Sequence, residues 1–294
     1  MEVSIETFET ALSHEHGNTD LAVIDEAKIQ QAEKEMLDQP QVECPLTHHF
    51  KPGVYIREVR MPAGTYAIGH YQKTEHLNVF VQGKVIMIYE DGTKEELSAP
   101  MTFVSKPGRK IGYVVEDVIW QNVYETDITD PVEAEEKFIE KSITFQEHQK
   151  NQQLFLSYDR SEDVADYFAV LDEFNISHEE ALETSYCEDD QVPMPYGSYQ
   201  FEVLESPIDG KGVFATSTME PETVVGVARL ADKRTPLGRY TNHSKYPNCV
   251  MVYEDDGNIY LKTIKQVSGC RGGQHGEELT IDYRQALNLK PKGN

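Results

Sequence analysis

The chain has 294 residues, of which 39% are hydrophobic and 10% aromatic, and its formal net charge is −24. That length is comfortable for two domains, and the hydrophobic content suffices for ordinary cores, which excludes wholesale disorder. The excess of acidic residues argues against a nucleic-acid partner, because neutralising phosphates requires clustered basic side chains. An acidic surface favours a Lys- or Arg-rich protein partner, although it also serves solubility alone.

The cysteine pattern and the hydropathy narrow the class of protein further. Cys44, Cys187, Cys249 and Cys270 are far apart and form no C-x-x-C pair, which argues against a zinc cluster. The first residues lack the basic start and apolar core of a signal peptide, and no apolar run approaches the roughly 18 residues of a membrane helix. We therefore expect a cytoplasmic protein with reduced thiols and no membrane partner.

The first half of the chain changes from a helical to a β pattern. Residues 1–41 are predicted to form a helical N-terminal segment, in which apolar residues recur at helical spacing before Pro40. From 42 to 129 the pattern favours strands: Val54–Met61 alternates, and Glu90-Asp-Gly92 is a hairpin signal. Short strands separated by Gly and Pro predict a barrel or sandwich, and the lack of intervening helical patterns disfavours a parallel α/β sheet.

The second half begins with helices and ends with strands. Residues 130–197 are predicted to form a helical linker, with a charged, amphipathic run from 132 to 149. Ser161–Leu171 is predicted to be a capped helix, and Ser177-His-Glu-Glu180 is a capping box that opens another. From 198 to 294 short strands return. The predicted fold class is therefore mainly β, with a helical linker between two β domains.

Residues 42–129 contain a spacing of Gly and His that resembles the first cupin motif. Gly64, His70, Gln72, His76 and Gly83 occupy its positions, and the region is also similar to small cupin-like proteins of bacteriophages. In a cupin barrel, two His separated by one residue direct both imidazoles inward, and further ligands complete a site for Fe, Mn, Zn or Ni. The resemblance implies a cupin-like barrel or sandwich, which often pairs as a homodimer.

The ligands of such a metal site are incomplete in this sequence. Gln72 replaces the second His, His76 stands where cupins usually have Glu, and no His follows Pro107-Gly108, where the second motif would supply one. We therefore expect no metal, with His70, Gln72 and His76 as weak candidate ligands. The barrel would then serve shape, dimerisation or partner binding. His48 and His49, just before the first strand, are expected at the surface.

Three further motifs follow one another near the C-terminus. They are Gly210-Lys-Gly-Val-Phe-Ala215, the run Arg239–Cys249 with Asn242-His-Ser and Pro247-Asn248, and Gly276-Glu-Glu-Leu-Thr-Ile-Asp-Tyr283. In this order they resemble the SET domain of protein lysine methyltransferases, over residues 198–287. The resemblance implies a β-clip fold in which the Asn-His strand and the tyrosine segment thread past one another as a pseudoknot. It also implies S-adenosylmethionine as cofactor and a Lys-containing protein as substrate.

The same resemblance assigns roles to particular residues. Gly210, Lys211, Gly212, Asn242 and His243 would bind the cofactor, and Tyr283 would be catalytic, with its hydroxyl beside the methyl group and the amine. Paired glycines also let a backbone approach a ligand closely. Taken singly, each motif has an ordinary alternative: a turn, an Asx turn with a hydrogen-bonded His, or a buried structural Tyr.

The sequence departs from the SET pattern on the substrate side. Residues 216–238 alone separate the first motif from the second, where SET domains usually insert a longer segment that builds one wall of the peptide groove. Aromatic residues of the lysine channel are therefore expected from Tyr240 and Tyr246, from the cupin-like domain, or from the linker helices. Those helices carry Tyr158, Tyr167 and Tyr186.

We expect an S-adenosylmethionine-dependent protein-lysine N-methyltransferase with an appended cupin-like domain. The alternative is a non-catalytic phage structural or host-interaction protein, located in the host cytoplasm, that uses both folds as scaffolds. A cupin-type oxygenase or isomerase is a third possibility, which the missing ligand histidines disfavour.

Overall fold

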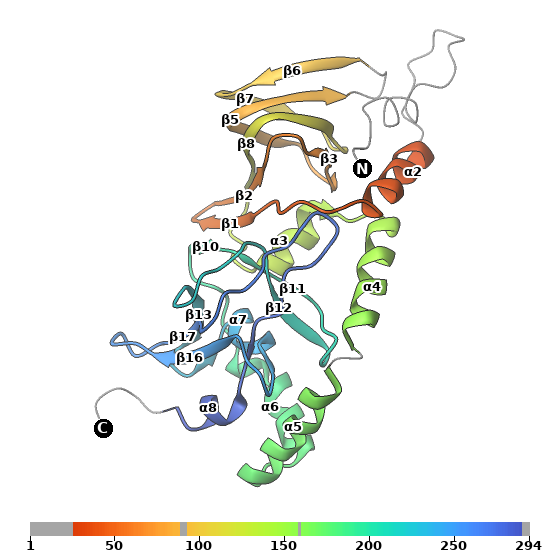
Figure 1. Cartoon of the computed structure of the whole chain (residues 1–294). Coiled ribbons are helices and arrows are strands. Elements are labelled where there is room, and N and C mark those ends of the chain that lie inside the picture. The colour runs from red at the N-terminus through yellow and green to blue at the C-terminus, as the bar shows by residue number, and fades with distance from the viewer. Residues whose placement is uncertain (1–25, 89–92, 158–159, 290–294) are drawn as a thin grey trace.

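The computed structural model describes residues 26–88, 93–157 and 160–289. Figure 1 shows a curved β-sheet at one end of the molecule and a group of smaller sheets in the middle. The linker helix at 143–157 runs along one side, and the helices at 161–174 and 178–186 lie at the end opposite the curved sheet. The predicted hairpin at 90–92 and Tyr158 lie outside the described residues, as do residues 1–25 of the predicted N-terminal helical segment. No helix in the described ranges is long and apolar enough to cross a membrane.

The first sheet has eight strands, and all its pairings are antiparallel. Its strands are β1 (Leu46–Lys51), β2 (Val54–Met61), β3 (Tyr66–Ile68), β5 (His76–Ile88), β6 (Lys94–Ser98), β7 (Met101–Ser105), β8 (Ile111–Glu125) and β10 (Gly197–Tyr199). Strand β5 is long, with 13 residues. It bends at Gly83, whose φ of +91° suits glycine and where a Cβ would lie 2.2 Å from the Asp117 carbonyl oxygen.

The helical linker begins with a well-capped helix. The linker helices are α3 (Pro131–Phe138), α4 (Ile143–Ser157), α5 (Ser161–Phe174) and α6 (His178–Tyr186). Helix α2 (Glu26–Leu37) belongs to the N-terminal segment. Asp130 accepts the amides of Val132 and Glu133, and Pro131 fills the first helical position, where no amide is needed. The predicted amphipathic run from 132 to 149 is interrupted by strand β9 (Ile139–Glu140), which pairs with β4 (Tyr71–Gln72) and ties the linker to the segment between β3 and β5.

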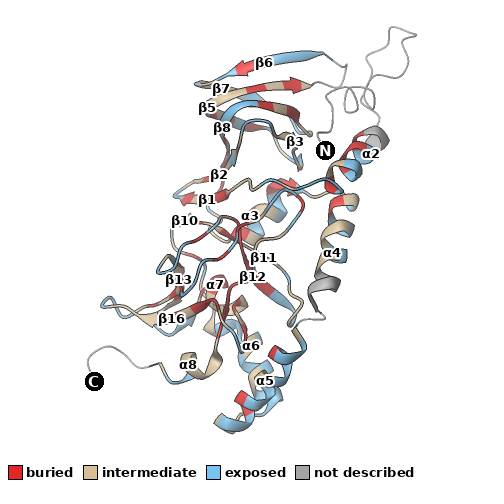
Figure 2. Cartoon of the chain, viewed as in Figure 1, coloured by how far each residue is buried: buried red, intermediate tan, exposed pale blue. Residues whose placement is uncertain are grey.

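Two predictions about helix starts have different outcomes. Ser177 and Glu180 form the predicted reciprocal capping box at the start of α6. The expectation of a side-chain cap on α5 is wrong, because the residue before Ser161 is Arg160, whose side chain makes no capping hydrogen bond. Much of α5 and α6 is exposed in Figure 2, so polar anchoring and not a wide apolar face must hold α5.

The second group of strands forms three small sheets. They comprise β11 (Phe201–Glu205) with β12 (Lys211–Ala215); β13 (Val224–Leu230), β14 (Lys233–Arg234), β16 (Cys249–Tyr253) and β17 (Ile259–Thr263); and β15 (Asn242–His243) with β18 (Thr280–Ile281). Two short helices adjoin this last pair: α7 (Pro236–Tyr240) precedes β15, and α8 (Tyr283–Leu287) follows β18. Among the named strands in the described part of the chain, only β15 and β18 pair in parallel.

One hydrophobic core joins the first sheet to the second group of strands. It contains Phe50 and Tyr55 from the first sheet, Phe138 from the linker, and Phe201 and Leu261 from the C-terminal half. Each fully buried side chain of this size contributes roughly 1.5–3 kcal/mol relative to exposure. Strand β10 extends the first sheet by pairing with β1, so both the sheet and the core cross the predicted boundary at residue 198.

The expectation that His48 is a surface residue is wrong. It is fully buried, its Nδ1 lies 2.8 Å from the Tyr55 hydroxyl, and its ring stacks between aromatic neighbours. The reason is that β1 lies between β2 and β10 and is not an edge strand. Burial lowers the pKa of His48 to about 4. His49, which points to the other face, is only partly buried and contacts the Ser198 hydroxyl.

Candidate active site

The candidate site forms where β15 and β18 lie side by side in parallel. Asn242 pairs with Thr280 and His243 with Ile281. Asn248, of the Pro-Asn turn, holds the two segments together. Its buried side-chain amide donates to the Glu278 carbonyl at 2.8 Å and accepts from the Thr280 amide at 2.8 Å. Strands of two residues have little cohesion of their own, so this side chain supplies the pairing that a longer ladder would give.

Asn242 connects the glycine loop to the tyrosine segment. Its Nδ2 lies 3.2 Å from the Asp209 carbonyl oxygen, 3.1 Å from that of Lys211, and 2.9 Å from Glu278 Oε1. The amide donors of Asn242 are thus occupied inside the protein. Gly210, in contrast, is exposed, has a left-handed φ of +48°, and has no atom within 4 Å of the position of a Cβ.

Gly212 is required by the approach of Glu278. A Cβ at 212 would lie only 2.2 Å from Glu278 Oε1. That oxygen accepts hydrogen bonds from Asn242 and from the Ser206 hydroxyl at 2.8 Å, whereas Oε2 is buried and has no hydrogen-bond partner in the described part of the chain. Burial raises the pKa of Glu278 against the opposing effect of these two hydrogen bonds. A buried carboxyl with one free oxygen can therefore accept a donor from a ligand.

His243 is a buried residue that orients its neighbours. Its Nδ1 accepts the Tyr283 backbone amide at 3.2 Å, so the ring proton lies on Nε2, which donates to Asp166 Oδ2 at 3.1 Å. The ring centroids of His243 and Tyr283 are 5.3 Å apart. Both ring nitrogens of His243 are therefore occupied by protein partners.

The Tyr283 hydroxyl lies beside the second motif. It donates to the Thr241 carbonyl at 3.2 Å, and the ring of Tyr167 meets that of Tyr283 edge-on with centroids 6.2 Å apart. Burial, together with Tyr167 and Asp209, raises the pKa of Tyr283 well above its usual value. The hydroxyl therefore keeps its proton near neutral pH.

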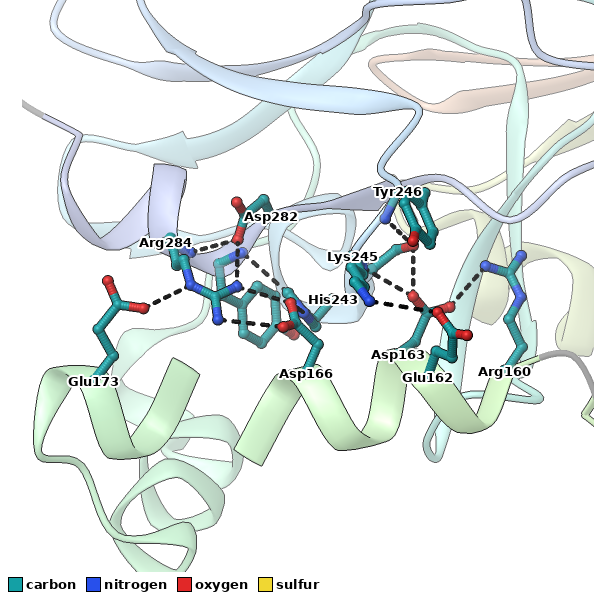
Figure 3. Close-up of polar contacts among 12 residues, drawn as sticks. Arg160, Glu162, Asp163, Asp166, Glu173, His243, Lys245, Tyr246, Asp282 and Arg284 are labelled. Carbon is teal, nitrogen blue, oxygen red and sulfur yellow. Dashed lines mark hydrogen bonds and ion pairs between the residues drawn. The ribbon is translucent and has the colours of Figure 1, made fainter. Parts of the chain in front are cut away.

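Helix α5 is attached to this site by two aspartates, which Figure 3 shows on the side of the helix that faces the motifs. Asp163 Oδ1 accepts the Ser244 hydroxyl at 2.8 Å and the Lys245 amide at 2.9 Å. Asp166 accepts from Arg284 at 2.8 and 3.3 Å as well as from His243. Hydrogen bonding from Arg284 is the main cause that lowers the pKa of Asp166.

Sequence reasoning missed Glu278, Asp163 and Asp166. Glu278 had a signal, since it is the second acid of the third motif. The two aspartates had none, because Asp166 and His243 are 77 positions apart and helical spacing does not identify such a partner. Tyr167 was one of three aromatic residues expected from the linker, and the structure places it against Tyr283.

The two tyrosines predicted to bind substrate lie in different surroundings. Tyr240 is partly buried, with Lys211 Nζ 6.0 Å and the Arg239 guanidinium 5.2 Å from its ring centroid. Tyr246 is 65% exposed, and Lys245 Nζ lies 5.4 Å from its ring centroid. Tyr240 also borders a cleft of about 600 Å³ lined by Thr126–Asp130, Glu133, Gln191–Pro193, Arg234–Pro236, Arg239 and Tyr240. Tyr240 therefore connects the glycine loop to a cleft of ligand size.

The weak metal candidates of the first sheet have other contacts. His70 meets the Phe145 ring edge-on at 4.7 Å between centroids, and Gln72 Oε1 accepts from the Tyr124 hydroxyl. His76 Nε2 lies 3.0 Å from Lys110 Nζ, so a lysine occupies the position that a metal bound to this nitrogen would take. Within the described ranges, no three His, Cys, Asp or Glu side chains are grouped so that they could hold a metal ion.

Comparisons with known proteins identify one family and several similar structures. The SET domain model matches residues 67–284. A search of curated proteins finds no match. Similar solved structures include a cupin domain from Bordetella pertussis Tohama I, with 14% identity, a TM-score of 0.26, and coverage of 30% of this chain and 98% of that one. An RmlC-like cupin family protein with a double-stranded β-helix fold from Methanocaldococcus jannaschii has 12% identity, a TM-score of 0.25, and coverage of 30% and 86%.

Proposed function

This chain belongs to the SET-domain family, and we propose that it is an S-adenosylmethionine-dependent protein-lysine N-methyltransferase with an appended cupin-like barrel. The main support is the meeting of the three motifs at one place. Asn242 joins the glycine loop to Glu278, and His243 joins the second motif to the backbone of Tyr283. The motifs are separated in the sequence, so these direct hydrogen bonds argue for a common site.

The residues of the site fit the proposed cofactor in two respects. The open space at Gly210 leaves room beside the loop, and Glu278 Oε2 is a buried acceptor with no hydrogen-bond partner among the described residues. When bound, S-adenosylmethionine supplies a methyl group on a cationic sulfonium, and it also carries an ammonium. A carboxyl oxygen is the natural acceptor for such a cation in a poorly solvated site. We propose that Gly210, Lys211, Gly212 and the backbone of Asn242 and His243 form the rest of the pocket.

The acceptor lysine would lie beside Tyr283. The protonated hydroxyl of Tyr283 has oxygen lone pairs that can accept an N–H of the amine and so orient the nitrogen. Tyr167, edge-on to Tyr283, adds an apolar wall. Removal from water disfavours an ammonium, and the reaction needs the neutral amine. The chain contributes orientation and a poorly hydrated environment, with no covalent intermediate on the protein.

We propose the cleft beside Tyr240 as the approach for the acceptor protein. Asp127, Asp130 and Glu133 line one part of it, and the net charge of the chain is −24. A Lys-rich segment of a partner would be attracted to such a surface. Arg234 and Arg239 line another part; Asp190 pairs with Arg234, and the three carboxylates of the lining outnumber its two guanidinium groups.

Isothermal titration with S-adenosylmethionine, followed by methyl transfer to a library of Lys-containing peptides, tests the proposal. Tyr283→Phe should retain cofactor binding and lower the methylation rate by about 100-fold, the usual effect of losing one such polar contact. Tyr196→Phe is the matched control, because Tyr196 is 49% exposed and lies outside the site. Absence of cofactor binding at millimolar concentration would refute the proposal. Binding without any transfer would favour the non-catalytic scaffold.

A further inference from the structure

Helices α5 and α6 expose apolar side chains that the candidate site does not use (Figure 2). Val164 and Phe168 on α5, and Leu182 and Tyr186 on α6, are between 36% and 69% exposed. The members of each pair are four residues apart, so they lie on one face of their helix. His178 precedes Leu182 by the same spacing, and its ring centroid is 5.3 Å from that of Phe168, which joins the two pairs. We call Val164, Phe168, Leu182 and Tyr186 the apolar row.

The segment that carries the apolar row is strongly acidic. Residues 161–190 hold 11 of the 51 acidic residues of the chain and none of its 27 basic residues. Basic side chains from outside the segment pair with five of these acids, which are Glu162, Asp163, Asp166, Glu173 and Asp190. The other six are exposed and have no ion-pair partner in the part of the chain that the structure describes; they are Asp172, Glu179, Glu180, Glu183, Glu188 and Asp189.

Three of these charges lie where helix energetics disfavours them. Glu179 and Glu183 are four residues apart on α6, a spacing at which like charges repel. Asp172 lies in the last turn of α5, at the negative end of the helix dipole, and no residue of that turn is basic. Local conflicts of this kind concentrate at surfaces that serve a function, where a ligand can relieve them.

Charge decides which kind of partner can cover the apolar row. A second copy of the chain would bring the same unpaired carboxylates and a net charge of −24. Nucleic acid and an anionic lipid surface would be repelled for the same reason. A segment with Lys or Arg on one side and apolar residues on the other satisfies both parts of the surface, since its cations meet the carboxylates and its apolar side chains cover the row.

We propose that the apolar row and its six unpaired carboxylates form a docking surface for a basic, amphipathic segment of the acceptor protein. That the partner is the acceptor protein rests on the proposed methyltransferase activity. The surface adjoins the candidate site on both sides: Tyr167, next to Phe168, meets Tyr283, and Asp190, at the end of the acidic segment, pairs with Arg234 of the cleft lining. A segment docked there would raise the local concentration of the acceptor lysine at the site.

Binding of a synthetic peptide to the full-length protein tests the surface without cofactor or methyl transfer. The probe is a fluorescent peptide of two Leu-Arg-Arg-Leu-Leu-Arg-Leu repeats, and anisotropy reports its dissociation constant. Phe168→Ser should weaken binding about tenfold, because an aromatic anchor is lost, and Tyr186→Ser should do the same independently. Binding that neither variant weakens would overturn the proposal. So would a dimer in sedimentation that Phe168→Ser dissociates, since it would assign the row to a second copy.

A matched pair of charge variants separates docking from attraction to the net charge alone. Glu179→Gln combined with Glu183→Gln should weaken peptide binding about fivefold, because two carboxylates beside the row are neutralised. Asp38→Asn combined with Glu75→Gln removes the same charge at exposed positions outside the surface and should alter binding by less than about twofold. Equal effects of the two combinations would overturn the proposal.

Methyl transfer then tests whether the acceptor protein uses this surface. A peptide with one lysine is compared with the same peptide fused to the Leu/Arg repeats. The fusion should lower KM about tenfold without changing kcat, and Tyr186→Ser should remove that advantage. Transfer to both peptides with equal KM would refute the docking role and leave the methyltransferase intact. No transfer to either peptide would refute the methyltransferase, while the binding results decide the surface by themselves.

Discussion

Replacing Gly212 with alanine should destabilise the candidate site through its effect on Glu278. The new Cβ would lie 2.2 Å from Glu278 Oε1 and 3.0 Å from the Ser206 Cβ. The carboxyl group can withdraw only by losing its hydrogen bonds from Asn242 and Ser206, each worth roughly 1–3 kcal/mol. Partial relaxation offsets some of this loss, so we expect the free energy of unfolding to fall by about 2–4 kcal/mol.

Denaturant unfolding of four proteins measures this effect: the wild type, Gly212→Ala, Glu278→Ala and the double variant. Removing the Glu278 carboxyl makes room for the methyl group, so the double variant should be more stable than the sum of the single losses predicts, by about 1–3 kcal/mol. Strictly additive losses would show that the methyl group does not meet Glu278, and would refute the reasoning. Cofactor titration of Glu278→Ala then reports separately on binding.

Two further predictions concern stability. Asp163→Ala should lower the free energy of unfolding by about 3 kcal/mol, because the Ser244 hydroxyl and the Lys245 amide lose a buried acceptor. The control Asp172→Ala, at an exposed position of the same helix, should change the free energy of unfolding by less than about 0.5 kcal/mol. Equal melting temperatures for the two variants would contradict this prediction. His48 has a pKa of about 4 in the folded state against 6.5 ordinarily, so the unfolded chain takes up the proton first as the pH falls, and stability is lost below about pH 6.5. From pH 7 to 5 this contributes about 2 kcal/mol, and His48→Gln should unfold with a correspondingly smaller dependence on pH.

Local patterns predicted the elements that local forces determine. The alternation in Val54–Met61 coincides with β2, since side chains of period two fit a half-buried strand. The capping box at Ser177 is equally local, as its donors and acceptors lie within one turn. The gathering of the three motifs, in contrast, was implied by the family resemblance and not by any periodicity.

What the sequence could not show depends on contacts between distant segments. The β15–β18 pair has two residues per strand, which is too short for a periodic signal, and it depends on the side chain of Asn248. Lys110 opposite His76 and Asp166 opposite His243 are single contacts across the fold. His48 was misjudged because a pair of histidines reads as polar, whereas its burial follows from the strand order of the sheet.

The short connection 216–238 and the position of α5 belong to one arrangement. Because that connection is short, we propose that the linker takes over part of the cover of Tyr283, whose ring Tyr167 meets edge-on. An exposed helix would not hold an aromatic side chain there by apolar packing alone. Asp163 and Asp166 provide the attachment, through the backbone and hydroxyl of the second motif and through His243 and Arg284. The residues that fix the helix are thus the same residues that shape the candidate site, so its geometry and the stability of α5 cannot vary independently.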